Sequence, residues 1–174
     1  MIVFIDEVGF GFLARLATTW APIGRTPVLR RKSGRREVST FVCLTLSGKI
    51  YKRHFSRAIR GEEVVEGLRH LRRHVRGPII IVWDRLRAHT SAVVKRYLTD
   101  EPDIYDEQLP PYAPDLNPEE QVHGNVKQRL RNANPITVTE LRTQVDRGFA
   151  RLRHRPDMLL GFIRHSGLKI KQLW

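Results

Sequence analysis

Two different hydrophobic periods divide the chain. In its first third, short apolar runs rich in β-branched residues alternate with turn residues, which is the pattern of buried strands. Ser47-Gly48 predicts one turn, and a basic stretch at 30–36 predicts a hairpin-like turn. Residues 9–27, which include two prolines, are expected to form a loop. The predicted strands form an antiparallel meander and cover residues 1–5, 38–46 and 49–55.

After residue 60 the apolar positions follow the period of an amphipathic helix. Val64, Leu68, Leu71 and Val75 fall on one stripe, and the opposite face is rich in arginine. The remaining predicted elements are a strand at 79–83, a helix at 91–98, a strand at 104–109, a helix that begins at Asn117-Pro118, and a last helix from about 139 that Pro156 ends or bends.

These elements predict one α/β domain over residues 1–174, with an antiparallel 1-2-3 sheet extended by two further strands and covered by helices. The length suits a single domain, and the chain has no internal repeat or long linker. A helical segment is expected at about 139–174.

The charge of the chain is unevenly distributed. The 31 Lys and Arg exceed the 18 Asp and Glu by 13, yet the segment from Asp100 to Glu120 holds eight acids and no Lys or Arg. A cationic body with one anionic segment is typical of a protein that neutralises phosphates and keeps its carboxylates for another task. Charge alone does not choose among DNA, RNA, an anionic membrane and solubility.

The single cysteine narrows the cellular setting. Cys43 leaves no partner for an intramolecular disulfide and no thiolate cluster for structural zinc, so a reducing cytoplasm is expected. The apolar runs are too short to cross a bilayer, and we expect no signal peptide.

Two of the predicted buried strands end in an aspartate, Asp6 and Asp84. A carboxylate is costly to bury unless a cation or hydrogen-bond donors receive it. On neighbouring strands, about 4.8 Å apart, the two acids are able to share a divalent ion at the carboxyl edge where α/β sheets bind ligands. Glu119 or Glu120 adds a third carboxylate in the first turn of the helix that Asn117 caps. Three carboxylates favour Mg²⁺ or Mn²⁺, and two such ions roughly 4 Å apart suit phosphodiester chemistry.

Each acid also has a structural explanation. Asp6 and Asp84 are each explained as caps of the turn that follows, and Glu120 as a helix-dipole and capping residue after Asn117. Their joint occurrence in a basic chain, in the order strand, strand, helix, favours the metal site.

Four segments around these acids resemble a known family. They are DEVGF (6–10), TWAPIGRTPVL (19–29), WDRLRAH (83–89) and LPPYAPDLNPEE (109–120). Together they resemble DDE transposases of the mariner-like superfamily, in its bacterial insertion-sequence branch. The resemblance extends from the first residue to about residue 132, and the proline-rich segment is its most distinctive part.

The resemblance implies a ribonuclease-H-like fold with parallel strands 1-4-5, and DNA strand cleavage and strand transfer that depend on two Mg²⁺ or Mn²⁺ ions. The implied catalytic and metal-binding residues are Asp6, Asp84 and Glu120, the Glu of the Asn-Pro-x-Glu motif. Between Asp84 and Glu120 there are 35 residues. Between Asp84 and the rival Glu119 there are 34, which is the family's usual spacing. The implied partners are transposon-end and target DNA, and a second copy in a homodimeric synaptic complex.

Three positions depart from the family's pattern. His123 stands where the motif helix usually carries Trp, and Arg85 follows Asp84 where many relatives have Asn. Asp6 lies five residues from Met1, whereas relatives place a helix-turn-helix region upstream, so we expect a catalytic domain alone.

Basic residues near the motifs are the candidates for contacts with DNA. A dense cluster on the expected hairpin is placed to track a DNA backbone, and His89 resembles the histidine of the second motif, which suggests that it orients a phosphate or a metal-bound water. The nucleic-acid-binding candidates are Arg25, Arg30, Arg31, Lys32, Arg35, Arg36 and His89.

The leading functional hypothesis is a transposase catalytic domain that cleaves DNA at transposon ends and joins the freed 3′-hydroxyl to target DNA. Such a protein is expected in the bacterial cytoplasm, at the nucleoid when DNA is bound. Two alternatives stay open: a catalytically inactive nucleic-acid-binding remnant, and another ribonuclease-H-like nuclease.

Overall fold

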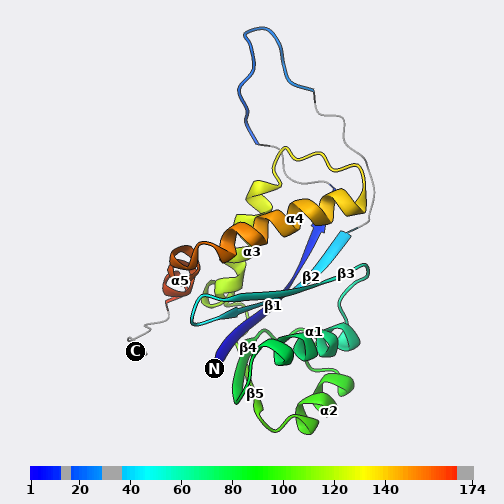
Figure 1. Ribbon diagram of the computed structural model, residues 1–174, viewed down its shortest axis with the longest axis vertical. Coiled ribbons are helices and arrows are strands. Elements are labelled where there is room, and N and C mark those ends of the chain that lie inside the picture. Colours follow the sequence, from blue (N-terminus) through cyan, green and yellow to red (C-terminus); the bar gives the residue numbers. More distant parts are fainter. Residues whose placement is uncertain (13–16, 29–36, 168–174) are drawn as a thin grey trace.

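A computed structural model describes residues 1–12, 17–28 and 37–167. Five strands form one sheet in the order β3-β2-β1-β4-β5 (Figure 1). The β1–β2 and β2–β3 pairs are antiparallel, and the β1–β4 and β4–β5 pairs are parallel. The predicted mixed five-stranded sheet is therefore confirmed. The strands are β1 (Ile2–Gly11), β2 (Glu37–Thr45), β3 (Ile50–Phe55), β4 (Ile79–Trp83) and β5 (Ile104–Gln108).

The first strand is longer than its apolar run predicted. The sequence placed its end at Asp6 and a loop from residue 9, but β1 continues to Gly11, which pairs with Glu37 of β2. Val8 and Phe10 stand two residues apart on β1, so both point to the same face, and both are buried. The second half of β1 therefore has hydrogen bonds to β2 and an apolar face in the core. Asp6 consequently lies in the middle of a strand. The hairpin-like turn expected at 30–36 lies outside the described residues.

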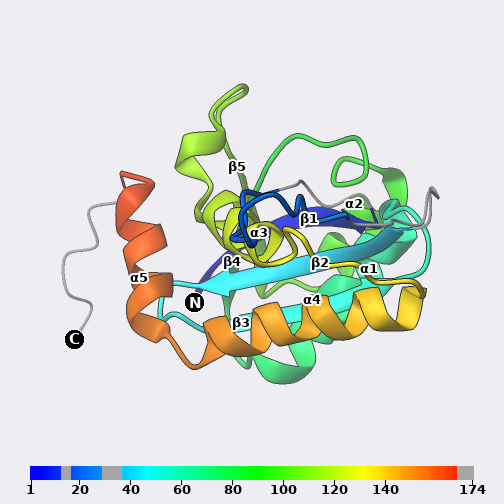
Figure 2. The same cartoon turned by 90° about the horizontal axis from the view of Figure 1, so that it is seen from above.

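Helices cover both faces of the sheet. Figures 1 and 2 show α1 and α2 on one side and α3, α4 and α5 on the other. Each side has its own apolar cluster, one around Trp83 and one around Phe149. The helices are α1 (Gly61–His74), α2 (Ala92–Asp100), α3 (Pro118–Arg129), α4 (Val138–Arg153) and α5 (Pro156–His165), and a short 3-10 turn spans Pro114–Leu116.

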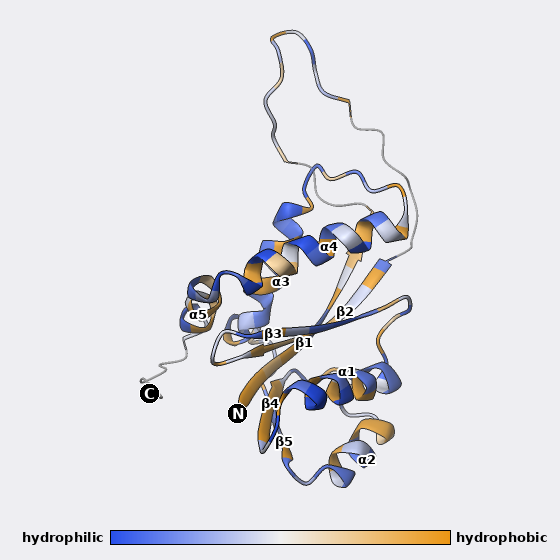
Figure 3. Cartoon of the chain, viewed as in Figure 1, coloured by the Kyte–Doolittle hydropathy of each residue, from blue (hydrophilic) through white to orange (hydrophobic). Residues whose placement is uncertain are grey.

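Close packing of α1 on the sheet depends on one glycine. A Cβ atom at Gly67 would lie 2.5 Å from the ring of Phe41 on β2, so no larger residue fits without moving the helix. Figure 3 shows the result as hydropathy: β1 and β4 are hydrophobic, whereas α1 carries a hydrophilic outer face. Within the described ranges, no helix is long and apolar enough to cross a membrane.

Candidate active site

An acidic pocket of about 490 Å³ opens where β4 and β5 end. Asp6 reaches it from β1, Asp84 from the residue after β4, and Glu120 from the first turn of α3. The proline-rich segment forms the opposite wall. The lining residues are Asp6, Asp84, Arg85, Leu86, Leu109, Pro110, Pro111, Tyr112, Ala113, Pro114, Asn117 and Glu120.

Strand register explains why the two aspartates meet. Phe4 of β1 pairs with Val82 of β4 in a parallel ladder. Two residues further along each chain stand Asp6 and Asp84, and side chains two apart on a strand point to the same face. The two acids therefore emerge side by side, as the alternation of the sequence predicts for neighbouring strands.

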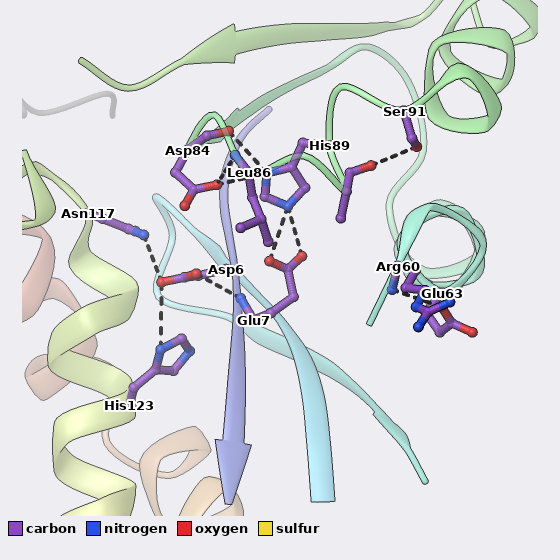
Figure 4. Close-up of polar contacts among 11 residues, drawn as sticks. Asp6, Glu7, Arg60, Glu63, Asp84, Leu86, His89, Ser91, Asn117 and His123 are labelled. Carbon is purple, nitrogen blue, oxygen red and sulfur yellow. Dashed lines mark hydrogen bonds and ion pairs between the residues drawn. The ribbon is translucent and has the colours of Figure 1, made fainter. Parts of the chain in front are cut away.

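Asp6 is held by hydrogen bonds on both carboxylate oxygens. Oδ1 accepts the backbone N–H of Glu7 at 2.8 Å, and Oδ2 accepts the side-chain amide of Asn117 at 3.0 Å (Figure 4). Burial, followed by repulsion from Glu7, Glu120 and Asp84, raises the pKa of Asp6 to about 7 despite the backbone hydrogen bond that lowers it. Neutralising this side chain with a proton or a metal ion is therefore favourable.

The two neighbouring glutamates of α3 face different surroundings. Asn117 caps the helix by accepting the N–H of Glu119 at 3.1 Å, as the Asn-Pro sequence predicted. Glu119 is fully buried, and neither of its carboxylate oxygens has a hydrogen-bond partner. Burial, then repulsion from Asp6, raises the pKa of Glu119 well above its usual range. Glu120 is exposed and lines the acidic pocket.

His123 lies one helical turn further along α3 and is also buried. Its Nδ1 is 3.7 Å from Oδ2 of Asp6, and one ligand atom each from Asp6, Glu120 and His123 fall within 4.8 Å of one another. Burial, then the nearby charge of Lys127, lowers the pKa of His123 to about 3, which keeps the imidazole neutral. Asp84 lines the same pocket without joining this closest group.

His89 links Asp84 to a fourth acid. Its Nδ1 is 2.9 Å from Oδ1 of Asp84, and its Nε2 is 2.9 Å from Oε1 of Glu7 (Figure 4). The ring also stacks on Trp83, with centroids 4.3 Å apart and planes 11° apart. Burial lowers the pKa of His89, but the hydrogen bonds to Asp84 and Glu7 outweigh burial and raise it to about 10.

The contact with His89 fixes the orientation of Asp84. The hydrogen bond from His89 is the main reason that the pKa of Asp84 is lowered, and burial opposes it. Oδ1 also accepts the backbone N–H of Leu86 at 2.9 Å. One oxygen of Asp84 is therefore engaged by protein donors, which leaves the other for the pocket.

The contact of Glu7 with His89 was not predicted from the sequence. As neighbours on a strand, Asp6 and Glu7 point to opposite faces of the sheet, so Glu7 reaches His89 on the α1 side. The Asp-Glu pair and His89 were both visible in the motifs, but 82 residues separate Glu7 from His89, and only the fold brings them together.

The predicted DNA-binding residues separate into three groups. Arg25 is exposed. His89 is buried, and both ring nitrogens already have protein partners. The remaining candidates, Arg30, Arg31, Lys32, Arg35 and Arg36, lie outside the described residues.

Chemically, the acidic pocket offers oxygen donors from three separate elements. The carboxylates match the preference of Mg²⁺ and Mn²⁺ for oxygen ligands. Burial and the neighbouring like charges that raise the pKa of Asp6 would be offset by a bound cation. The residues present therefore fit a hard divalent ion.

The sheet order and the acidic pocket at the ends of its parallel strands define a ribonuclease-H-like fold. The family model described as DDE superfamily endonuclease matches residues 1–142, and the chain belongs to this family. The DDE family predicted from the four motifs is thereby confirmed, and its bacterial insertion-sequence branch stays a prediction.

Solved structures with the same fold come from the Mos1 transposase. The Mos1 strand transfer complex is 19% identical with a TM-score of 0.67, over 98% of this chain and 56% of that chain. The Mos1 mariner paired end complex with Mn is 17% identical with a TM-score of 0.67, over the same shares. The catalytic domain of Mos1 mariner transposase is 17% identical with a TM-score of 0.62, over 98% of this chain and 84% of that domain. The chain thus spans about half the length of the Mos1 chains in the complexes. No curated protein matches the sequence significantly.

Proposed function

We propose that the chain is the catalytic domain of a DDE transposase, which cleaves DNA at transposon ends and transfers the freed strand to target DNA. The observation that carries the proposal is the convergence of Asp6, Asp84 and Glu120 on one pocket from β1, the end of β4 and α3. Family membership and the shared fold with Mos1 transposase support the same reaction.

Asp6, Asp84 and Glu120 are the proposed metal ligands and catalytic residues. Glu120 is preferred over Glu119 because it is exposed in the acidic pocket, whereas Glu119 is enclosed in the protein. These residues would hold Mg²⁺ or Mn²⁺, two ions by analogy with other phosphodiester enzymes, which would supply activation of the attacking hydroxyl and stabilisation of the leaving oxygen. His123 is a further candidate ligand.

Other residues position the acids or the DNA. Asn117 orients Asp6 through its amide, and His89 orients Asp84 while Glu7 holds the far side of the ring. For His89, this positioning role is proposed in place of the expected orientation of a phosphate or a metal-bound water. Outer-shell partners of this kind fix the geometry of metal ligands.

Tyr112 stands at the rim of the acidic pocket. Its side chain is fully exposed, and its backbone has a φ of 58°, in the left-handed region that aromatic residues rarely adopt. Strain of this kind concentrates at functional sites. We assign the ring to stacking on a base of the DNA segment that enters the pocket.

The proposed partners are duplex DNA and a second copy of the chain. Arg25 and the cluster Arg30, Arg31, Lys32, Arg35 and Arg36 are assigned to the DNA backbone. The homodimer follows the paired-end arrangement named for the Mos1 complexes. A bacterial cytoplasm, with DNA-bound protein at the nucleoid, suits a chain whose one cysteine is buried and unpaired.

Nicking of supercoiled plasmid by the purified chain tests the proposal. We expect nicking with Mn²⁺ or Mg²⁺ and none with EDTA. Asp84→Asn should slow it by more than about a hundredfold, beyond the usual cost of losing an outer-shell partner. The matched control is Asp115→Asn, because Asp115 is an exposed acid of the proline-rich segment 109–120 that does not line the pocket. Equal nicking by Asp84→Asn and the wild type would overturn the assignment.

A further inference from the structure

A second concave site lies at the opposite edge of the sheet and is basic. This basic groove, about 480 Å³ in volume, runs along the start of edge strand β3 and between the last turns of α1 and α4. Its titratable lining residues, apart from Tyr51, are Lys49, Lys52, His70, His74 and Arg153, and no Asp or Glu lines it.

Most of these basic side chains lack an acidic partner. Among the described residues, Lys49, His70 and Arg153 form no ion pair with a carboxylate. Lys52 is the exception, because it pairs with Asp146 of α4. On the same helix, by contrast, Arg72 lies outside the groove and pairs with Glu101 and Asp103. Apart from Lys52, the basic side chains of the groove are therefore not neutralised by carboxylates among the described residues.

The positive charges around the groove also act on the pKa of His70. Burial, then the charges of His74, Arg53, Arg73 and Arg153, lowers the pKa of His70. An anion in the groove would oppose these charges and favour the protonated imidazole.

Contacts within the basic groove hold its aromatic side in place. Nδ1 of His74 donates to the carbonyl oxygen of His70 at 2.9 Å, and the two rings lie 4.7 Å apart. The ring of His74 also lies 5.3 Å from that of Tyr51 on β3. Nε2 of His74 has no hydrogen-bond partner among the described residues and is available to a ligand. An edge strand adds outward N–H groups that have no strand partner.

We propose that the basic groove binds the phosphodiester backbone of DNA, at a site separate from the acidic pocket. This rests on the proposed function, because the duplex held here is the one cleaved in the pocket. Cationic side chains and N–H donors recognise phosphate oxygens without reading sequence, so the groove supplies position and affinity. Its volume suits a segment of sugar-phosphate chain.

The sheet fixes how close the two sites are. Asp6 pairs with Val42, and Val42 pairs with Lys52, so all three occupy one row across β1, β2 and β3. Two strand spacings, roughly 10 Å, separate the backbones at the ends of the row. One helical turn of DNA is about 34 Å long, so a single duplex is long enough to contact both sites.

The test measures duplex binding in EDTA, where no cleavage occurs, as a function of salt. Lys49→Gln combined with Arg153→Gln should weaken binding roughly tenfold and reduce the slope of log K against log salt by about 1.8, since each lost phosphate contact contributes about 0.9. Lys95→Gln with Arg96→Gln, which removes the same charge from exposed positions of α2, should leave that slope unchanged. Equal slopes for both pairs would overturn the proposal.

A second measurement follows the groove directly. Addition of a short duplex in EDTA should raise the pKa of His70, read from its imidazole resonances, and an unchanged pKa would contradict the proposal. Asp84→Asn should leave both results intact while it stops nicking. A result that contradicts DNA binding by the groove can therefore be distinguished from one that contradicts the proposed catalytic site.

Discussion

The acidic pocket and the basic groove are of similar size and belong to the same sheet, yet they carry opposite charge. The pocket gathers acids from the middle of β1, the end of β4 and the first turn of α3, whereas the groove gathers basic side chains at edge strand β3. The excess of 13 positive charges is therefore not spread evenly. The separation allows one surface to attract phosphate while the other attracts the metal ion that would activate the attacking hydroxyl.

The largest expected effect separates the two glutamates of α3. Glu120→Gln removes a carboxylate from the acidic pocket and should slow metal-dependent nicking by more than about a hundredfold. Glu119→Gln is the matched control, since glutamine resembles the protonated form that burial favours at this position. Plasmid nicking measured for both variants decides the case. If Glu119→Gln is the inactive one, the third acid has been assigned to the wrong residue.

The acidic pocket should also make stability depend on pH when no metal is bound. The pKa of Asp6 is raised from 3.8 to about 7, so its contribution is fully present below pH 3.8 and is lost as the pH rises through 7. At about 1.4 kcal/mol for each pKa unit, the metal-free protein should lose at most roughly 4 kcal/mol over this range. Thermal melting of the wild type and Asp6→Asn in EDTA at pH 5 and pH 7.5 measures the difference.

Adding Mn²⁺ at pH 7.5 should restore the melting temperature of the wild type, because the cation replaces the proton at Asp6. Asp6→Asn should show a flatter pH dependence and a weaker response to Mn²⁺. Identical pH profiles for the two proteins would show that Asp6 does not carry the effect.

Smaller losses of metal affinity are expected when a residue that positions one of the pocket acids is replaced. Glu7→Gln keeps the shape of the side chain but weakens its hold on His89, so Asp84 should be less well oriented. Mn²⁺ affinity should fall by about ten- to a hundredfold, the usual cost of removing an outer-shell partner. Glu62→Gln, an exposed acid on α1, is the control. An unchanged Mn²⁺ affinity of Glu7→Gln would show that Glu7 does not position Asp84 through His89.

Replacement of Tyr112 should cause the smallest effect, a loss of DNA affinity. Tyr112→Ala removes the ring at the rim of the acidic pocket, and base stacking is worth about 1–3 kcal/mol. DNA affinity in EDTA should therefore fall while Mn²⁺ affinity stays constant. Tyr112→Phe keeps the ring and should bind DNA as the wild type does; equal loss in both variants would point to the hydroxyl instead of stacking.

Most of the fold could be predicted because its elements are locally encoded. The strand at 79–83 was predicted with its observed bounds, and Asn117-Pro118 marked the start of α3. The extension of β1 to Gly11 was missed because glycines interrupt its apolar pattern. That half of the strand depends on pairing with β2, which lies more than 25 residues away along the chain.

The acids of the candidate site were predictable only in part. Asp6 and Asp84 each follow an apolar run, which is a local feature. Glu119 and Glu120 are neighbours on a helix, and which of them faces the acidic pocket depends on how α3 packs against the sheet. The link from Glu7 through His89 to Asp84 joins opposite faces and distant segments, so no local pattern reveals it.

Calorimetric titration of Mn²⁺ tests the central claim most directly. The wild type should bind Mn²⁺, and Asp6→Asn, Asp84→Asn and Glu120→Gln should each lose most of that binding while Glu119→Gln keeps it. Retention of wild-type Mn²⁺ binding by all three pocket variants would contradict the assignment of the acidic pocket as a metal-dependent active site.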